Sequence, residues 1–330
     1  MRTFIRLMCL LLCIVLAMPA ASASSMYEST RDPDPIPVLS ENEIPPTPEG
    51  IEHYMLICCD RWDAKLENLG HTDGLILVTV DTYARRVMLT SFIRDMLILR
   101  PDGDFGRINN ICGKYGSGKN GKYGSGKNGI ETLVGVINSH FGLKIDKYIV
   151  VDFGQVERIV DAIGGVDITI TDKEANYLKN YRISASSTEP AINRGGTYHF
   201  SGHAAVIYMR IRKVQTIYGA TQDVGRTERA RTVLTTIGDS LKDATYEQAV
   251  NIMQAVLENT VLTNMTAADM TKALTIALDL KGTPIESIRM PIDGTYELMP
   301  VAGMATQQID YIENRKALDD FLFGSFVVME

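Results

Sequence analysis

The charged residues with the clearest chemical potential gather between positions 208 and 231. Arg210 and Arg212 stand two residues apart, which in an extended segment would place both side chains on one side. Asp223 precedes a helical pattern and is suited to cap that helix, while the three-residue spacing of Arg226 and Arg229 predicts that they share its exposed face. Four like charges repel unless an anion or carboxylates neutralise them, and a pyrophosphate would do so. The alternative is a solvated helix face with a network of salt bridges.

Two further groups of charged residues lie at the ends of predicted strands. Asp60 follows one apolar run and Asp73 directly precedes the next, so their carboxylates converge if these strands are neighbours. Two aspartates together with a phosphate are suitable ligands for Mg²⁺, although aspartates are also common as plain turn residues. Arg94 and Asp95 end a third strand-like run, where the guanidinium could bind phosphate oxygens or form a simple surface pair with Asp95.

The elements that must position these residues follow from apolar periodicity and turn signals. The predicted strands are 54–59, 74–80, 87–92, 147–152 and 167–171. The predicted helices are 130–141, 154–163, 202–208, 227–243, 246–262, 267–279 and 312–323, and residues 285–299 are predicted to form a hairpin around Asp293-Gly294. Strands that alternate with helices indicate a layered α/β domain.

The domain organisation is predicted from the first 50 residues. Residues 1–23 join two arginines, a short apolar run and a small-residue tract, which is typical of a cleavable secretory signal, with an uncleaved membrane anchor as the alternative. Residues 24–50 hold six of the 12 prolines and predict an extended linker that forms no core. Residues 51–330 show no second boundary and are predicted to form one folded domain outside the cytoplasm.

The composition excludes several classes of protein. The chain has 330 residues, of which 45% are hydrophobic and 22% charged, so it is neither a disordered polyelectrolyte nor a disulfide-dense miniprotein. The formal net charge of -7 argues against general nucleic-acid binding, which needs a basic face. Neither the five cysteines nor the five histidines have the spacing of a zinc site.

An octad, GKYGSGKN, occurs at 113–120 and again at 121–128. Each copy resembles a phosphate-binding loop, but the position that should carry a hydroxyl is Asn120 or Asn128, and the segment does not follow a buried strand. We therefore reject a nucleotide-binding loop and expect a duplication in a tolerant surface loop.

The ordered motifs resemble those of the LytR-CpsA-Psr family. They are D-x-R after the first strand, T-D-G before the second, F-I-R-D, K-Y-I-V-V-D-F, I-V-D-A-I-G-G-V-D, S-G-x-x-A-x-x-Y-x-R-x-R and D-x-G-R-T-E-R. The resemblance extends from about Ile51 to the carboxyl terminus and implies a single layered α-β-α domain with a central mixed sheet. The chain departs from the family at Ala230, where members often have Gln, and in the longer loop before Ile130.

The resemblance also implies an activity. Members are phosphotransferases of the bacterial cell envelope that move teichoic-acid, capsular or related glycopolymers from polyprenyl pyrophosphate to peptidoglycan, use Mg²⁺, and hold the lipid in an apolar tunnel. It implies a location in the cell envelope, membrane-associated or secreted. Residue by residue, it implies metal ligands at Asp60 and Asp73 and a pyrophosphate site at the following positions: Arg94, Arg210, Arg212, Asp223 and Arg226.

Two alternatives on the same fold stay open from the sequence. One is a protein that binds polyprenyl pyrophosphate or wall polymer without converting it, and the other is a hydrolase that delivers the glycan phosphate to water. We expect the lipid among the apolar residues of 130–163 and 246–279, and the acceptor proton at Asp73 or Asp223.

Overall fold

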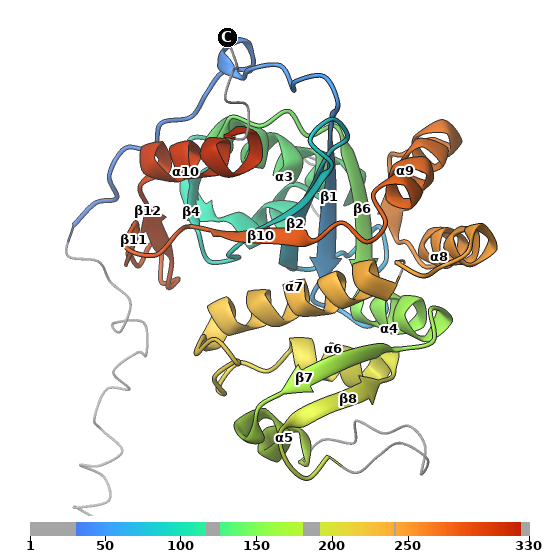
Figure 1. Cartoon of the computed structure of the whole chain (residues 1–330). Coiled ribbons are helices and arrows are strands. Elements are labelled where there is room, and N and C mark those ends of the chain that lie inside the picture. The colour runs from blue at the N-terminus through green and yellow to red at the C-terminus, as the bar shows by residue number, and fades with distance from the viewer. Residues whose placement is uncertain (1–30, 117–125, 181–191, 241, 325–330) are drawn as a thin grey trace, which may run out of the picture.

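A six-stranded mixed sheet forms the centre of the protein (Figure 1). The computed structural model describes residues 31–116, 126–180, 192–240 and 242–324. In spatial order the strands are β10 (Ile285–Met290), β3 (Arg86–Phe92), β2 (Thr72–Asp81), β1 (Ile51–Cys59), β6 (Lys147–Asp152) and β9 (Leu262–Thr263). β1 pairs antiparallel with β2 and parallel with β6, while β10 joins β3 in parallel. The layered α/β fold with a central mixed sheet is therefore confirmed.

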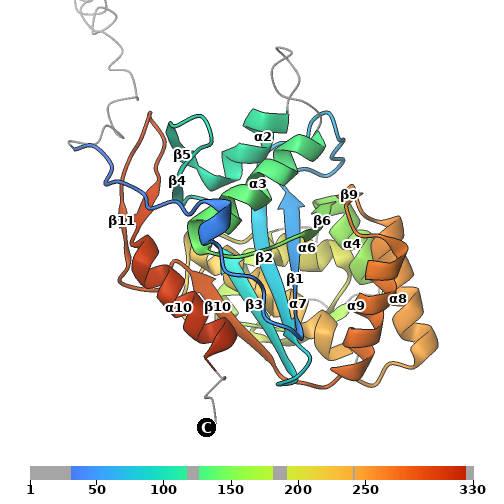
Figure 2. The same ribbon diagram turned by 90° about the horizontal axis from the view of Figure 1, so that it is seen from above.

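The two faces of the sheet bury different sets of side chains. Because side chains alternate along a strand, Met55 and Ile57 of β1 enter the main core while Leu56 and Cys58 face the other way. The main core is covered by α3 (Gly126–Phe141) and α10 (Tyr311–Phe323). The opposite face is covered by α4 (Phe153–Ala162) and α7 (Gln222–Ser240). Figure 2 shows α8 (Tyr246–Glu258) beside α9 (Ala267–Asp279) at the β6–β9 edge.

A smaller unit with its own apolar core lies beyond α7 (Figure 1). It contains the antiparallel pair β7 (Val166–Ile170) and β8 (Gly196–Phe200), together with α5 (Asp172–Leu178) and α6 (Gly202–Met209). Along the chain α4 follows β6 directly and leads into this unit, and α7 follows the unit and leads to α8. The remaining elements are η2 (Glu41–Glu43), β4 (Leu97–Leu99), β5 (Phe105–Arg107), η3 (Ile108–Asn110), α2 (Ile111–Gly116), β11 (Tyr296–Leu298) and β12 (Gln307–Ile309).

Two predictions about local structure were wrong. Residues 285–299 do not form a hairpin, because β10 pairs with β3 in the main sheet and β11 pairs instead with β12. The Asp293-Gly294 turn is present in the chain, but pairing with a distant strand buries Met290 completely, which a local hairpin would not do. The duplicated octad is not a loop throughout, since its first residues end α2 and its last residues begin α3 at Gly126.

The predicted linker is largely extended where it is described, but it contributes to the core. Between residues 31 and 50 only η2 is regular, yet Ile36 is buried in the main core and the main-chain N–H of Leu39 donates to the carbonyl of Ser139 over 2.9 Å. The expectation that this segment forms no core is wrong at Ile36. The predicted signal, residues 1–23, lies outside the described residues. Among the described helices none has both the length and the apolar character needed to cross a bilayer.

Candidate active site

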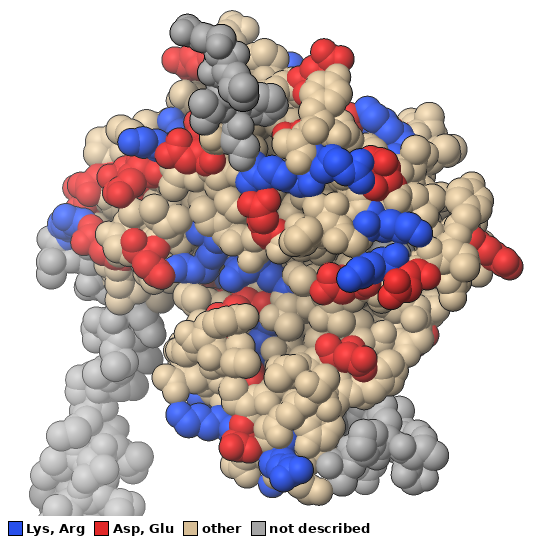
Figure 3. Space-filling view, viewed as in Figure 1, with Lys and Arg blue, Asp and Glu red and all other residues tan. Residues whose placement is uncertain are grey.

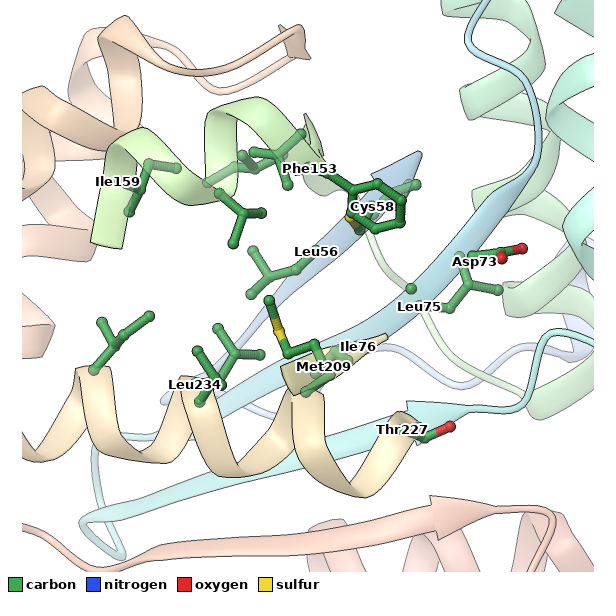
Figure 4. A pocket seen from close by; sticks show the side chains of 18 of the residues that line it. Leu56, Cys58, Asp73, Leu75, Ile76, Phe153, Ile159, Met209, Thr227 and Leu234 are labelled. Atoms are coloured by element: carbon green, nitrogen blue, oxygen red, sulfur yellow. The ribbon is translucent and has the colours of Figure 1, made fainter. Parts of the chain in front are cut away.

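An apolar cavity of about 250 Å³ lies between the sheet and the helices of its second face. Its walls come from β1, β2, β6, α4 and α7, with single contributions from α6 and α8. Figure 4 shows Leu56, Ile159 and Leu234 directed into this space, with Asp73 at the far side from Ile159. The apolar lining consists of Leu56, Ile57, Leu75, Ile76, Ile149, Val151, Phe153, Val156, Ile159, Val160, Met209, Ala230, Val233, Leu234, Ile237 and Val256.

The residues that line the cavity can be compared with the ranges where the lipid is expected. The expected range 130–163 contributes through β6 and α4, and 246–279 contributes Val256 alone. α3, most of which also lies in the range 130–163, packs in the main core on the opposite face and does not line this cavity. α7 supplies Val233, Leu234 and Ile237, although it lies outside the ranges in which the lipid was expected. Its apolar residues are indistinguishable in sequence from those of an ordinary core helix.

The charged end of the cavity is organised around Asp73, at the start of β2. Its carboxylate accepts hydrogen bonds from Arg94 at 2.6 Å, Arg226 at 3.1 Å and the amide of Asn109 at 3.2 Å. Burial by itself would raise the pKa of Asp73, but the two arginines and Asn109 together hold that pKa below its ordinary value. Asp73 is therefore ionised and joins three chain segments that are distant in sequence.

Asp223 holds the same arginines from the first turn of α7. It forms ion pairs with Arg94 at 3.1 Å, Arg212 at 3.3 Å and Arg226 at 3.7 Å. The prediction that Asp223 precedes and caps this helix was wrong, because α7 already begins at Gln222. Burial opposes ionisation, but a hydrogen bond from Asp95 and the nearby arginines lower the pKa of Asp223.

Asp95 is an acid whose pKa is raised partly by the neighbouring Asp223 carboxylate. Burial, followed by the hydrogen bond and charge of Asp223, raises the pKa of Asp95 to about 6, against the opposing charges of Arg107 and Arg94. A pair between Arg94 and Asp95 was one of the two predictions for Arg94, and the structure contains this ion pair at 3.7 Å. The Asp95–Asp223 pair at the edge of the charged cluster thus takes up one proton as the pH falls toward about 6.

Arg210 and Arg212 were predicted to lie together in an extended segment, and this was wrong. α6 runs to Met209 and Arg210 caps its C-terminus with helical dihedral angles, because the apolar run Ala204–Tyr208 packs as a helix in the smaller core. Arg212 is exposed and pairs with Asp223. Arg210 is also exposed and lines the cavity, and among the described residues it forms no ion pair. Its guanidinium is therefore available to an anion.

Arg229 was predicted to share the exposed face of Arg226, and this was wrong. Its side chain is completely buried and donates to Glu174 at 2.8 Å and to the carbonyls of Ile211 and Val214, each at 2.9 Å. A guanidinium can be buried in this way because each of its three nitrogen atoms donates to an acceptor. Arg229 is thus structural, and it fixes the segment that carries Arg212.

Asp60 and Asp73 lie at the same end of two adjacent strands, as predicted. Asp60 directly follows β1, is exposed, and donates its main-chain N–H to His71 over 2.9 Å. Burial and then the charges of Asp152, Asp73 and Asp60 raise the pKa of the Cys58 thiol to about 12. Within the described part of the chain no three His, Cys, Asp or Glu side chains are grouped as a metal site.

The residues present nevertheless suit Mg²⁺. Carboxylate oxygens are the hard ligands that this ion prefers, and it commonly takes one or two carboxylates together with phosphate oxygens. Asp73 accepts three hydrogen bonds in the structure, while a carboxylate offers about four lone-pair sites, so one remains for a metal. Asp60 is exposed and would supply the second carboxylate.

The site combines an apolar cavity with a charged end at which arginines and aspartates lie together. Within the cluster three arginines are neutralised by aspartates, and Arg210 adds a positive charge at the cavity wall. Such a site suits an amphipathic ligand with an anionic head, since the head would meet guanidinium donors while the tail stays dry. On the face in Figure 3, basic and acidic side chains of the described residues are interspersed, without the broad basic surface that nucleic acid requires.

Comparisons with known proteins show the family of this chain. The model of the LytR_cpsA_psr family matches residues 20–318. A curated relative, the polyisoprenyl-teichoic acid–peptidoglycan teichoic acid transferase TagV of Bacillus subtilis, is 25% identical over 199 residues, which are 59% of this chain and 45% of the relative. The match thus spans less than half the length of that relative.

Two solved structures have the same fold. The crystal structure of B. subtilis TagV superposes with a TM-score of 0.61 at 21% identity and covers 84% of this chain and 98% of that one. The structure described as TagT bound to LIIa-WTA gives a TM-score of 0.61 at 19% identity and covers 86% of this chain and 96% of that one.

Proposed function

The chain belongs to the LytR-CpsA-Psr family, and we propose that it is an extracytoplasmic phosphotransferase that moves a glycopolymer from a polyprenyl-pyrophosphate carrier to peptidoglycan. The observation that carries the proposal is the apolar cavity whose one end is lined by Asp73, Arg210 and Arg226. The relatives named as teichoic acid transferases support the same reaction class. Teichoic acid and capsular polysaccharide are both suitable glycopolymers.

The proposed reaction places the polyprenyl chain in the cavity and the pyrophosphate among the arginines. A hydroxyl of the acceptor sugar attacks the phosphorus next to the glycopolymer, a new oxygen–phosphorus bond forms, and the bridging bond breaks to release polyprenyl phosphate. Arg210 has no carboxylate partner among the described residues, so it can bind the pyrophosphate without first breaking an ion pair. Oriented cations of this kind stabilise charge that develops on the phosphate oxygens.

The remaining charged residues would orient the site and accept the proton. Asp73 and Asp223 hold Arg94 and Arg226 in fixed positions, which reduces the reorganisation needed when charge develops. Of Asp73 and Asp223, Asp223 is the better candidate base, because the Asp95–Asp223 pair is largely ionised at neutral pH and can take up one proton with a pKa of about 6. Mg²⁺ bound by Asp60 and Asp73 would supply further positive charge to the phosphate oxygens.

A transfer assay with the purified protein tests this proposal. The substrates are a polyprenyl-pyrophosphate disaccharide and a soluble glycan acceptor, with Mg²⁺ or with a chelator. We expect a phosphodiester-linked product that requires the metal, and a loss of about a hundredfold in rate for Arg210→Ala, comparable to the removal of one charge-stabilising donor. Arg85→Ala is the matched control, because Arg85 is exposed and lies beyond the other end of β2.

The outcomes separate the rival functions. Retained lipid pyrophosphate without product would indicate a binding protein, and a free glycan phosphate would indicate a hydrolase. Full activity of Arg210→Ala would contradict the assignment of the pyrophosphate site.

A further inference from the structure

Trp62 is a large apolar side chain that the fold holds at the surface. It is 42% exposed, and it is the only tryptophan in the chain. It follows β1 by three residues and lies against the start of α4, at the end of the sheet where Asp60 and Asp73 stand. Single exposed apolar residues are common, so exposure alone does not indicate a role.

The segment that carries Trp62 is tightly anchored. The main-chain N–H of Phe153 donates to the carbonyl of Arg61 at 2.9 Å, and the N–H of Ala64 donates to Asp152 at 2.7 Å. Gly154 allows the closest approach, because a Cβ at that position would lie 2.6 Å from the carbonyl oxygen of Trp62. The main chain is therefore fixed on both sides of Trp62, which restricts where the indole can lie.

The indole is also in contact with the charged end of the cavity. The guanidinium of Arg210 lies 5.6 Å from the centre of the Trp62 ring and 4.7 Å from that of Phe153, and the two rings are 5.7 Å apart in an edge-on arrangement. Arg210 and Phe153 line the cavity, whereas Trp62 does not. Trp62 is thus the next group outward from the cavity, beyond the arginine assigned to the pyrophosphate.

This order matches the order of groups in a lipid-linked glycan. With the lipid in the cavity and the pyrophosphate at Arg210, the group that follows outward is a sugar ring. The weakly positive C–H groups on the apolar face of a pyranose are attracted to the negative face of an aromatic ring.

We propose that Trp62 is a stacking platform for a pyranose ring adjacent to the pyrophosphate. The proposal rests on the proposed function, because it assigns a subsite next to the assigned pyrophosphate position. The sugar can belong to the donor glycan or to the acceptor glycan, which bring the same chemistry to the same place.

Binding measured by titration calorimetry on the purified full chain tests the platform. The probes are a polyprenyl pyrophosphate without sugar, the same lipid pyrophosphate with a disaccharide, and a soluble peptidoglycan fragment. We expect Trp62→Ala to leave the affinity for the sugar-free lipid within about twofold, and to weaken binding of a sugar-bearing probe about tenfold, as for loss of one aromatic contact. Trp62→Phe should retain part of the affinity.

The control is Tyr246→Ala, which removes another exposed aromatic residue at the start of α8. It should change none of the affinities. The single tryptophan provides a second readout, because its fluorescence should change with a sugar-bearing probe and less with the sugar-free lipid.

The results distinguish a failure of the Trp62 platform from a failure of the proposed function. Loss of affinity for the disaccharide lipid alone places the donor sugar on Trp62, and loss for the peptidoglycan fragment alone places the acceptor sugar there. An equal loss for the sugar-free lipid and the disaccharide lipid in Trp62→Ala would mean that the indole only supports Arg210, and this would overturn the platform. If the wild-type protein binds no lipid pyrophosphate at all, the proposed function itself fails.

Discussion

Replacement of Arg229 by methionine is expected to destabilise the protein strongly although the residue touches no ligand. The side chain is completely buried, and Glu174, its ionic partner at 2.8 Å, is 1% exposed. Arg229→Met leaves the carboxylate buried without its cation, and it also leaves the carbonyls of Ile211 and Val214 without their donor. Methionine is similar in length, so loss of volume contributes little.

The size of the effect follows from the burial of the pair. Removal of one partner from a buried pair costs about 3–5 kcal/mol, because the other charge stays in the interior. The lost bonds to two neutral carbonyls belong to the same network, so their cost is not simply additive. We therefore expect a loss of about 4 kcal/mol in the free energy of unfolding, which is a large part of the ~5–15 kcal/mol typical of a domain.

Equilibrium urea denaturation followed by circular dichroism measures this loss. The double variant Arg229→Met/Glu174→Gln should recover about 2 kcal/mol, because it removes the uncompensated charge while glutamine can still cap α5. Lys127→Met is the control, since it breaks an exposed ion pair with Glu131 and should cost less than about 1 kcal/mol. A loss below 1 kcal/mol for Arg229→Met would refute the reasoning, as would a double variant less stable than the single one.

Two further predictions concern packing and pH. Gly202→Ala should destabilise the protein by about 1–3 kcal/mol in urea denaturation, because the new Cβ would overlap the main chain of Glu157. Gly135→Ala is the control: its Cβ has open space in α3, so it should stabilise the protein by about 0.5–1 kcal/mol. Equal effects of the two substitutions would contradict the close approach of Gly202 to Glu157. Burial lowers the pKa of His140 from 6.5 to about 4. Between these two pKa values the unfolded chain binds a proton at His140 that the folded chain does not bind. The free energy of unfolding should therefore fall by up to about 3 kcal/mol as the pH falls from 6.5 to about 4. In the variant His140→Gln the free energy of unfolding should depend less on pH than in the wild-type protein. Parallel pH profiles of the two proteins would contradict the role of His140.

The strands were predictable because their apolar runs are short and bounded by turn residues. β1 and β2 proved to be neighbours, which brought Asp60 and Asp73 to one end of the sheet as expected. The hairpin around Asp293-Gly294 failed because a turn signal is local, whereas the pairing of β10 with β3 depends on residues about 200 positions away. Sequence patterns contain no information on such distant register.

The site was predictable in its residue types more than in its partners. Arg94 and Arg226 both contact Asp73. The local sequence did not distinguish Arg226 from the buried Arg229, because their spacing predicts that both lie on one face of α7. A buried arginine becomes visible only when its acceptors are known, and those of Arg229 come from α5 and from the segment after α6. The same limit applies to Trp62, whose role depends on contacts with α4 and α6.

The most direct test of the central claim is to locate the lipid on the protein. A polyprenyl pyrophosphate with a photoreactive group in its tail would be crosslinked to the purified chain, and the labelled peptides identified by mass spectrometry. We expect labelling of cavity residues such as Leu56, Val156 and Leu234, and loss of that labelling with an excess of unmodified polyprenyl pyrophosphate. Saturable labelling confined to other surfaces, such as α9 or α10, would contradict the assignment of the cavity as the lipid site.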